Sequence, residues 1–191
     1  GEEDSNISTV NIQSNIKQEK HNWTYAFNGN ITKSVFDEQG NTYQVGSFNT
    51  LTNFVDGTSL NANYTPNISY SDAYIIKLND SGELQWSSII SGEKDQISRD
   101  IIISSDGNLI VQAQTDEIAT FSDGDQLGDN DTQNNNFLIK INSNDGDILW
   151  KTVDNSSYTV NNNFQRNAVL SNGDILFFPY YYYENDPNYD I

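Results

Sequence analysis

The sequence predicts an all-β fold built from a repeated unit. Three tryptophans, Trp23, Trp86 and Trp150, lie 63 and 64 residues apart, and the 191 residues span about three such periods. Short segments rich in Ile, Val, Tyr and Phe alternate with polar, glycine-containing turns, which is typical of β-hairpins. The apolar residues show no helical periodicity. These observations indicate about three copies of one β-unit.

Two sequence patterns recur in step with the tryptophans. The first occupies Asp72–Trp86 (DAYIIKLNDSGELQW) and Asn135–Trp150 (NNFLIKINSNDGDILW). Each copy begins with an aromatic residue, followed by aliphatic residues on both sides of a lysine and then an Asn. A glycine-containing turn comes next and leads to the tryptophan. The second pattern reads as a hairpin and occupies Ser34–Phe48, Asp100–Gln114 and Asn167–Pro179, with turn glycines 67 and 66 residues apart. Three aligned copies favour a true repeat over coincidence.

The second unit predicts a four-stranded antiparallel meander. Its expected strands are Asp100–Ser104, Asn108–Thr115, Asn136–Asn142 and Ile148–Val153, with a long loop between the second and third. Several strands are apolar at neighbouring positions, as expected where both faces of a sheet are covered. Radially stacked four-stranded sheets provide such burial. We therefore expect a β-propeller fragment with two full blades plus part of a third.

The domain organisation follows from this repeat. Residues 1–20 are polar and read as a leader or linker, and residues 21–191 as an incomplete propeller. The expected units are about 21–86, 87–150 and 151–191. Because Pro187–Ile191 aligns with the start of a third strand, we expect a longer chain, or alternatively a partner chain, to complete the ring.

The same segments resemble a known family. Asp72–Trp86 and Ser104–Thr115 (SSDGNLIVQAQT) resemble the bacterial β-propeller repeat called the SBBP repeat, and the resemblance covers roughly Asn22–Ile191. Ile141–Lys151 also resembles blades of quinoprotein-like propellers. Both resemblances imply a propeller, and the first implies an extracytoplasmic bacterial scaffold. The acidic Gly1–Asp4 resembles the stretch after the lipidated Cys of surface lipoproteins, which implies a lipid anchor through an upstream Cys.

Composition excludes several classes of function. The chain has 9 Lys and Arg against 27 Asp and Glu, a formal charge of −18, and no Cys. Disulfides, cysteine-ligated metals and thiolate catalysis are therefore excluded, and phosphate backbones are repelled, so nucleic acid is not an expected partner. No apolar run is long enough to span a membrane. With His21 as the only histidine and no Gly-x-Ser-x-Gly motif, we expect no catalytic residues in this segment.

The connection between the second and third strands of each unit contains a repeated motif. Phe54–Leu60 (FVDGTSL) aligns with Phe121–Leu127 (FSDGDQL), and we expect the Phe and Leu to anchor each loop on the sheets. The second copy carries additional aspartates that alternate on a glycine-containing loop, as in a Ca²⁺ site, although their spacing does not match the twelve-residue EF-hand loop. Two interpretations stay open, a Ca²⁺ site or a solvated acidic loop. The residues concerned are Asp123, Asp125, Asp129 and Asp131.

A run of four tyrosines is the candidate binding surface. Exposed Tyr rings stack on sugars or contact protein, although alternation along a strand lets only half of them share a face. The alternative interpretation is that the rings pack between the third unit and its neighbour. The residues are Tyr180, Tyr181, Tyr182 and Tyr183.

Together these features predict a function in binding. The main hypothesis is a non-catalytic scaffold at the bacterial cell surface or secreted from the cell, with a protein or glycan as partner and calcium as the one cofactor to consider. Alternatives are a propeller enzyme, such as a quinoprotein-like dehydrogenase or a glycan-active enzyme, with its active site outside this segment, or a subunit of a larger surface assembly.

Overall fold

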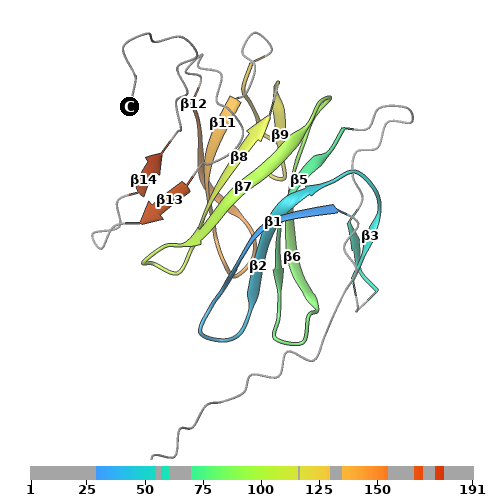
Figure 1. Cartoon of the computed structure of the whole chain (residues 1–191), viewed down its shortest axis with the longest axis vertical. Coiled ribbons are helices and arrows are strands. Elements are labelled where there is room, and N and C mark those ends of the chain that lie inside the picture. The colour runs from blue at the N-terminus through green and yellow to red at the C-terminus, as the bar shows by residue number, and fades with distance from the viewer. Residues whose placement is uncertain are drawn as a thin grey trace, which may run out of the picture.

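The computed structural model of the chain describes two β-sheets and two separate hairpins (Figure 1). It describes residues 29–54, 57–60, 70–115, 117–129, 135–154, 166–169 and 175–178. All regular structure in this part of the chain is β-strand, as the sequence predicts. The described residues include no helix that could cross a membrane.

The first sheet begins with an antiparallel meander. Its strands follow one another in space as β1 (Gly29–Phe36), β2 (Thr42–Phe48), β5 (Asp72–Leu78) and β6 (Leu84–Ser91). The register is continuous between β2 and β5, whereas the β1–β2 and β5–β6 pairs each contain a register shift. The two central strands are buried along almost their whole length. This confirms that their consecutive apolar residues reflect cover on both faces.

The second sheet is the four-stranded meander that the sequence predicts for the second unit. It consists of β7 (Gln96–Ile103), β8 (Leu109–Thr115), β11 (Asn135–Ile141) and β12 (Ile148–Asp154), each paired antiparallel with the next. The bounds of the last three strands agree with prediction to within one residue. Glycine turns and branched apolar residues are therefore sufficient signals for these strands.

The prediction for β7 is wrong at its start. Asp100–Ser104 was expected, but pairing with β8 begins at Gln96, opposite Thr115, and continues through a register shift between Ser98 and Asp100. Two polar residues of this extension, Gln96 and Ser98, are buried. A hydrophobic pattern does not mark such a segment as a strand, whereas its backbone groups still need the partners that β8 supplies.

The long loops expected between the second and third strands are a further correction, because both contain short hairpins. β3 (Thr52–Asn53) pairs with β4 (Ser59–Leu60), and β9 (Ala119–Phe121) pairs with β10 (Gln126–Leu127). In the second hairpin the N–H of Gly124 donates to the carbonyl of Phe121 at 2.9 Å. Gly124 has a φ of 87°, which glycine adopts without steric cost.

The anchoring role predicted for these segments is confirmed. Phe54, Leu60 and Phe121 are buried, and Leu127 packs partly buried against the main core. In addition β9 pairs with the edge of β6, with Phe121 opposite Ile90. The β9–β10 hairpin thus belongs to the second unit in sequence but extends the first sheet.

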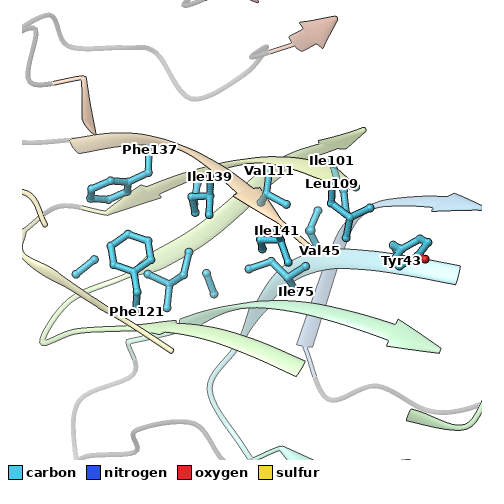
Figure 2. Packing of buried hydrophobic residues seen from close by; sticks show 14 of the residues in the cluster. Tyr43, Val45, Ile75, Ile101, Leu109, Val111, Phe121, Phe137, Ile139 and Ile141 are labelled. Carbon is cyan, nitrogen blue, oxygen red and sulfur yellow. The ribbon is translucent and has the colours of Figure 1, made fainter. Parts of the chain in front are cut away.

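The main hydrophobic core lies between the two sheets (Figure 2). Val45 and Ile75 of the first sheet and Val111 of the second are fully buried there. The rings of Phe121 and Phe137 meet edge to face with their centroids 5.3 Å apart. A second cluster packs the first sheet against its β3–β4 hairpin and consists of Phe48, Phe54, Leu60, Tyr74, Ile76 and Leu78. Burial of both faces makes the first sheet the central layer of the described structure.

A third hairpin lies beside the second sheet. β13 (Arg166–Val169) pairs with β14 (Ile175–Phe178), as predicted from the repeat of the hairpin pattern. β13 lies next to β7, and β7 in turn lies next to β1 (Figure 1). The first strands of the three units are therefore neighbours in sequence order. The described sheets do not close into a ring.

A turn of the second sheet covers Trp86 of the first. The Trp86 side chain is only 9% exposed, and its Nε1 donates a hydrogen bond of 3.1 Å to the carbonyl of Ser143. Gly146, in the same turn, has a φ of 83°, and a Cβ added there would lie 2.8 Å from the indole ring. This turn therefore needs glycine both for its backbone and for its approach to the first sheet.

We predict that Gly146→Ala destabilises the protein more than Gly107→Ala. Both glycines have positive φ, but an added Cβ at Gly107 meets nothing within 4 Å. We expect a loss of about 1–2 kcal/mol at Gly107 from backbone strain, and about 2–4 kcal/mol at Gly146, where crowding is added. Urea unfolding followed by tryptophan fluorescence measures both. Equal losses would show that the close approach of Gly146 to Trp86 does not affect the free energy of unfolding.

Candidate functional site

The acidic loop predicted as a calcium site forms the turn of the β9–β10 hairpin and the chain after it. Asp123 and Asp125 lie in the turn, where the Asp125 N–H donates to Asp123 Oδ1 at 3.1 Å. Asp129 follows β10, and its backbone carbonyl accepts a hydrogen bond of 3.0 Å from the amide of Asn135. Asp131 lies outside the described residues. The structure therefore brings two of the four carboxylates together.

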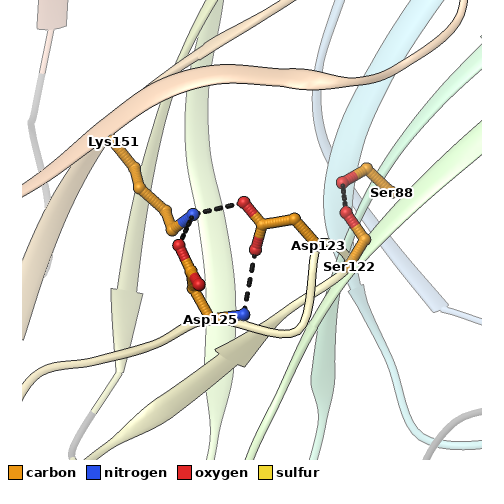
Figure 3. A network of polar contacts seen from close by, with 5 residues as sticks. All are labelled: Ser88, Ser122, Asp123, Asp125 and Lys151. Atoms are coloured by element: carbon orange, nitrogen blue, oxygen red, sulfur yellow. Dashed lines mark hydrogen bonds and ion pairs between the residues drawn. The ribbon is translucent and has the colours of Figure 1, made fainter.

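The cation at these two carboxylates is a lysine (Figure 3). Lys151 of β12 bonds Asp123 Oδ2, and its Nζ lies 2.8 Å from Asp125 Oδ2. The ammonium also sits 5.4 Å from the centroid of the Phe121 ring. The Lys151 side chain is 9% exposed, so its charge is largely withdrawn from water and held by two counter-charges.

The titration of both partners reflects this pairing. Burial raises the pKa of Asp123. The hydrogen bond from Lys151 and its positive charge outweigh this effect, so the pKa lies below its ordinary value. Burial lowers the pKa of Lys151, and the two carboxylates more than reverse this effect. Among the described residues no group of three or more Asp, Glu or His side chains could hold a metal ion. Calcium binding by the complete set of four aspartates stays a prediction.

The same turn also contacts the first sheet. Ser122 and Ser88 of β6 share a hydrogen bond of 2.7 Å between their hydroxyls (Figure 3). Because Asp123 and Asp125 bind the second sheet through Lys151, one turn of four residues joins both sheets. The acidic loop thus has a structural role in the described part of the chain.

We predict that Lys151→Met destabilises the protein by about 1–2 kcal/mol, because it leaves two neighbouring carboxylates unpaired, one of which, Asp123, is only 33% exposed. Lys140→Met is the matched control. Lys140 pairs with one carboxylate, that of Asp106 at 2.6 Å, and the Asp106 side chain is about half exposed. Its loss should cost less than about 1 kcal/mol. Thermal unfolding of both variants at pH 7 measures the two losses of stability. A larger loss for Lys140→Met would contradict the stabilising role of the ion pairs of Lys151.

The tyrosine run predicted as a binding surface, Tyr180, Tyr181, Tyr182 and Tyr183, lies outside the described residues. Both interpretations of it therefore stay predictions. The described part of the chain instead has a groove that sequence reasoning missed.

This groove lies at the end of the two sheets where their tight turns meet. It has a volume of about 630 Å³. Three turns surround it: the β1–β2 turn of the first sheet, and the β7–β8 and β11–β12 turns of the second. The residues of the first sheet that line it are Phe36, Asp37, Glu38, Gln39, Asn41, Tyr43 and Lys77, and those of the second are Ile103, Ser104, Ser105, Gly107, Ser143 and Asn144.

Asp37 organises the first-sheet side of the groove. Its carboxylate accepts hydrogen bonds from the N–H groups of Gln39 and Asn41, at 3.0 and 2.9 Å. It also accepts one of 2.8 Å from the Asn41 side-chain amide and one of 3.0 Å from the Tyr43 hydroxyl. A carboxylate that closes its own turn in this way fixes the position of the groove wall.

Tyr43 and Lys77 connect the groove to the second sheet. The Lys77 ammonium lies 5.4 Å from the centroid of the Tyr43 ring and donates a hydrogen bond of 3.0 Å to the carbonyl of Ser143. The same carbonyl accepts the hydrogen bond of Trp86. One backbone oxygen of the β11–β12 turn therefore holds two side chains of the first sheet, and this contact sets the distance between the groove walls.

The pKa values of Asp37 and Tyr43 follow from these contacts. Burial raises the pKa of Asp37, but the hydrogen bonds from Asn41, Tyr43 and Gln39 outweigh it, so the pKa lies below its ordinary value. Burial and the hydrogen bond to Asp37 raise the pKa of Tyr43 to about 12. At neutral pH the groove thus contains an ionised Asp37 and a neutral Tyr43 phenol.

A sequence signal for part of this site existed. The β1–β2 turn reads Asp-x-x-Gly, and Asp37 is the only acidic residue at the first position among the described turns of the two four-stranded meanders, where Ser104, Asn79 and Asn142 stand in the others. The groove itself could not be read from sequence, because its three turns are far apart along the chain. No protein-family model matches the chain, and no curated protein matches it in sequence.

We predict that Tyr43 ionises late because of its burial and its hydrogen bond to Asp37. The folded state favours the neutral phenol, so its contribution to stability is present below the unfolded pKa of 10.0 and is lost as pH rises toward about 12. The absorbance titration at 295 nm of the native protein minus that of Tyr43→Phe should therefore rise only well above pH 10. Asp37→Asn should shift this difference to lower pH. An unshifted titration in Asp37→Asn would show that Asp37 does not contribute to the raised pKa of Tyr43.

Proposed function

We propose that the chain contributes blades to a β-propeller that serves as a non-catalytic binding scaffold outside the cytoplasm of a bacterium. One observation carries the proposal: the second unit adds its β9–β10 hairpin to the outer edge of the first sheet, at β6. The same unit covers Trp86 with its β11–β12 turn. Each contact passes from one unit to the sheet of the unit before it, which is what a series of stacked blades requires.

The arrangement of strands supports the same architecture. The first strands of the three units, β1, β7 and β13, lie side by side in sequence order. An ion pair of 2.5 Å between Lys33 of β1 and the buried Asp100 of β7 joins the first two of them. Successive first strands that are neighbours would surround the axis of a propeller, with later strands of each sheet farther out.

The outer strand of the second sheet matches this interpretation. Trp150 of β12 corresponds to Trp86 and is 38% exposed, whereas Trp86 is covered by the next unit. Among the described residues no strand pairs with the outer edge of β12. This edge and Trp150 therefore have the position at which a further blade would dock.

The site chemistry favours binding. Asp37 already accepts four hydrogen bonds, and the pKa of Tyr43 is raised to about 12, so neither group is suited to exchange protons with a substrate near neutral pH. The charge of −18, the lack of Cys and the resemblance to SBBP repeats support a place at the bacterial surface. Protein and glycan are the two partner classes of the proposal.

Surface digestion tests the localisation. Proteinase K added to intact cells of the source bacterium should release peptides of this chain into the medium, while a ribosomal protein in the same cells stays undigested. Lysed cells serve as the control in which both proteins are cleaved. Survival of the chain on intact cells together with its cleavage after lysis would contradict a scaffold at the cell surface.

A further inference from the structure

We infer that the groove between the sheet turns binds a neutral oligosaccharide. This inference rests on the proposed role as a binding scaffold and names its ligand class. The volume of about 630 Å³ falls within the range of roughly 300–1,000 Å³ typical of small-molecule sites. Such a concave site suits a short chain of sugars better than a protein surface, which generally needs a larger and flatter contact.

An aromatic ring stands at the rim of the groove. Phe36, the last residue of β1, lines the groove and is 59% exposed, although large apolar side chains at this level of exposure are costly to hydrate. A pyranose ring carries C–H groups on one face and hydroxyls around its edge. Its C–H face can stack on an exposed aromatic ring while its hydroxyls reach neighbouring polar groups.

Neutral polar groups surround this ring. Gln39 and Asn41 lie on the first-sheet wall, and Ser105 and Asn144 lie on the wall formed by the second sheet. Amide and hydroxyl side chains offer both donors and acceptors, so they match sugar hydroxyls, which also act as both. A wholly apolar ligand would leave these groups without compensation for lost water.

The charges of the groove disfavour an anionic ligand. Asp37 and Glu38 on one wall disfavour anions, and the overall charge of −18 adds to this effect. The cation among the lining residues, Lys77, is held by the Ser143 carbonyl and the Tyr43 ring. Asp37 accepts four hydrogen bonds from the protein, which leaves little capacity to pair with a cationic ligand.

Isothermal titration calorimetry of the full chain with neutral trisaccharides tests the inference. The probes are linear trisaccharides of glucose, mannose, galactose and N-acetylglucosamine, with a sialylated trisaccharide as the anionic comparison. At least one neutral probe should bind with a dissociation constant of about 1 mM or tighter, and the sialylated probe should bind more weakly. A sialylated probe that binds equally well would overturn the assignment to neutral sugars.

Two matched variants locate the site. Phe36→Ala should weaken binding about tenfold or more, because the stacking surface is lost. Tyr70→Ala is the control, since Tyr70 is also an exposed ring, at 45%, but precedes β5 at the opposite end of the first sheet. Both variants should keep the unfolding midpoint of the parent protein. Equal binding by Phe36→Ala and the parent protein would show that the sugar binds elsewhere.

The outcomes separate this inference from the proposed function. If no neutral probe binds while surface digestion still releases the chain, the sugar site is wrong and a protein partner becomes the remaining form of the scaffold proposal. If a sugar binds through Phe36 but the chain is protected on intact cells, the groove assignment stands and the cell-surface role is wrong.

Discussion

The β9–β10 hairpin is the contact on which the relation between the two sheets depends. It pairs with β6 through Phe121, and its turn bonds Ser88 of the first sheet and Lys151 of the second. Phe121 then packs against Phe137 in the core between the sheets. Hydrogen bonds, an ion pair and apolar burial thus act within one short segment.

The groove depends on a second set of contacts between the sheets. Its walls belong to different sheets, so their separation depends on the contacts between sheets, above all those that Trp86 and Lys77 make with the Ser143 carbonyl. The Asp37 carboxylate orders one wall from within. A binding scaffold needs this kind of rigid support, because a loosely held loop would lose conformational entropy when a ligand binds.

The acidic loop shows how tertiary contacts change the meaning of a motif. Alternating aspartates on a glycine turn are compatible with calcium, with solvation or with a basic partner, and spacing alone does not distinguish these. Lys151 lies 26 residues after Asp125 in sequence but reaches it across a sheet edge. In the described part of the chain, the positive charge beside Asp123 and Asp125 is the Lys151 ammonium, where the sequence pattern alone is also compatible with a metal ion.

From the pattern of residues alone, the sequence predicts the local structure. Glycine turns such as that at Gly107 and apolar runs such as those of β5 and β11 specify strands and hairpins because these preferences act over a few residues. It also showed that Phe54 and Phe121 would be anchors. Three features became visible only in the folded chain: the buried polar Gln96 belongs to a strand, the second unit extends the first sheet, and three turns form a groove. These features depend on backbone pairing and on contacts between residues distant in sequence, which no local pattern records.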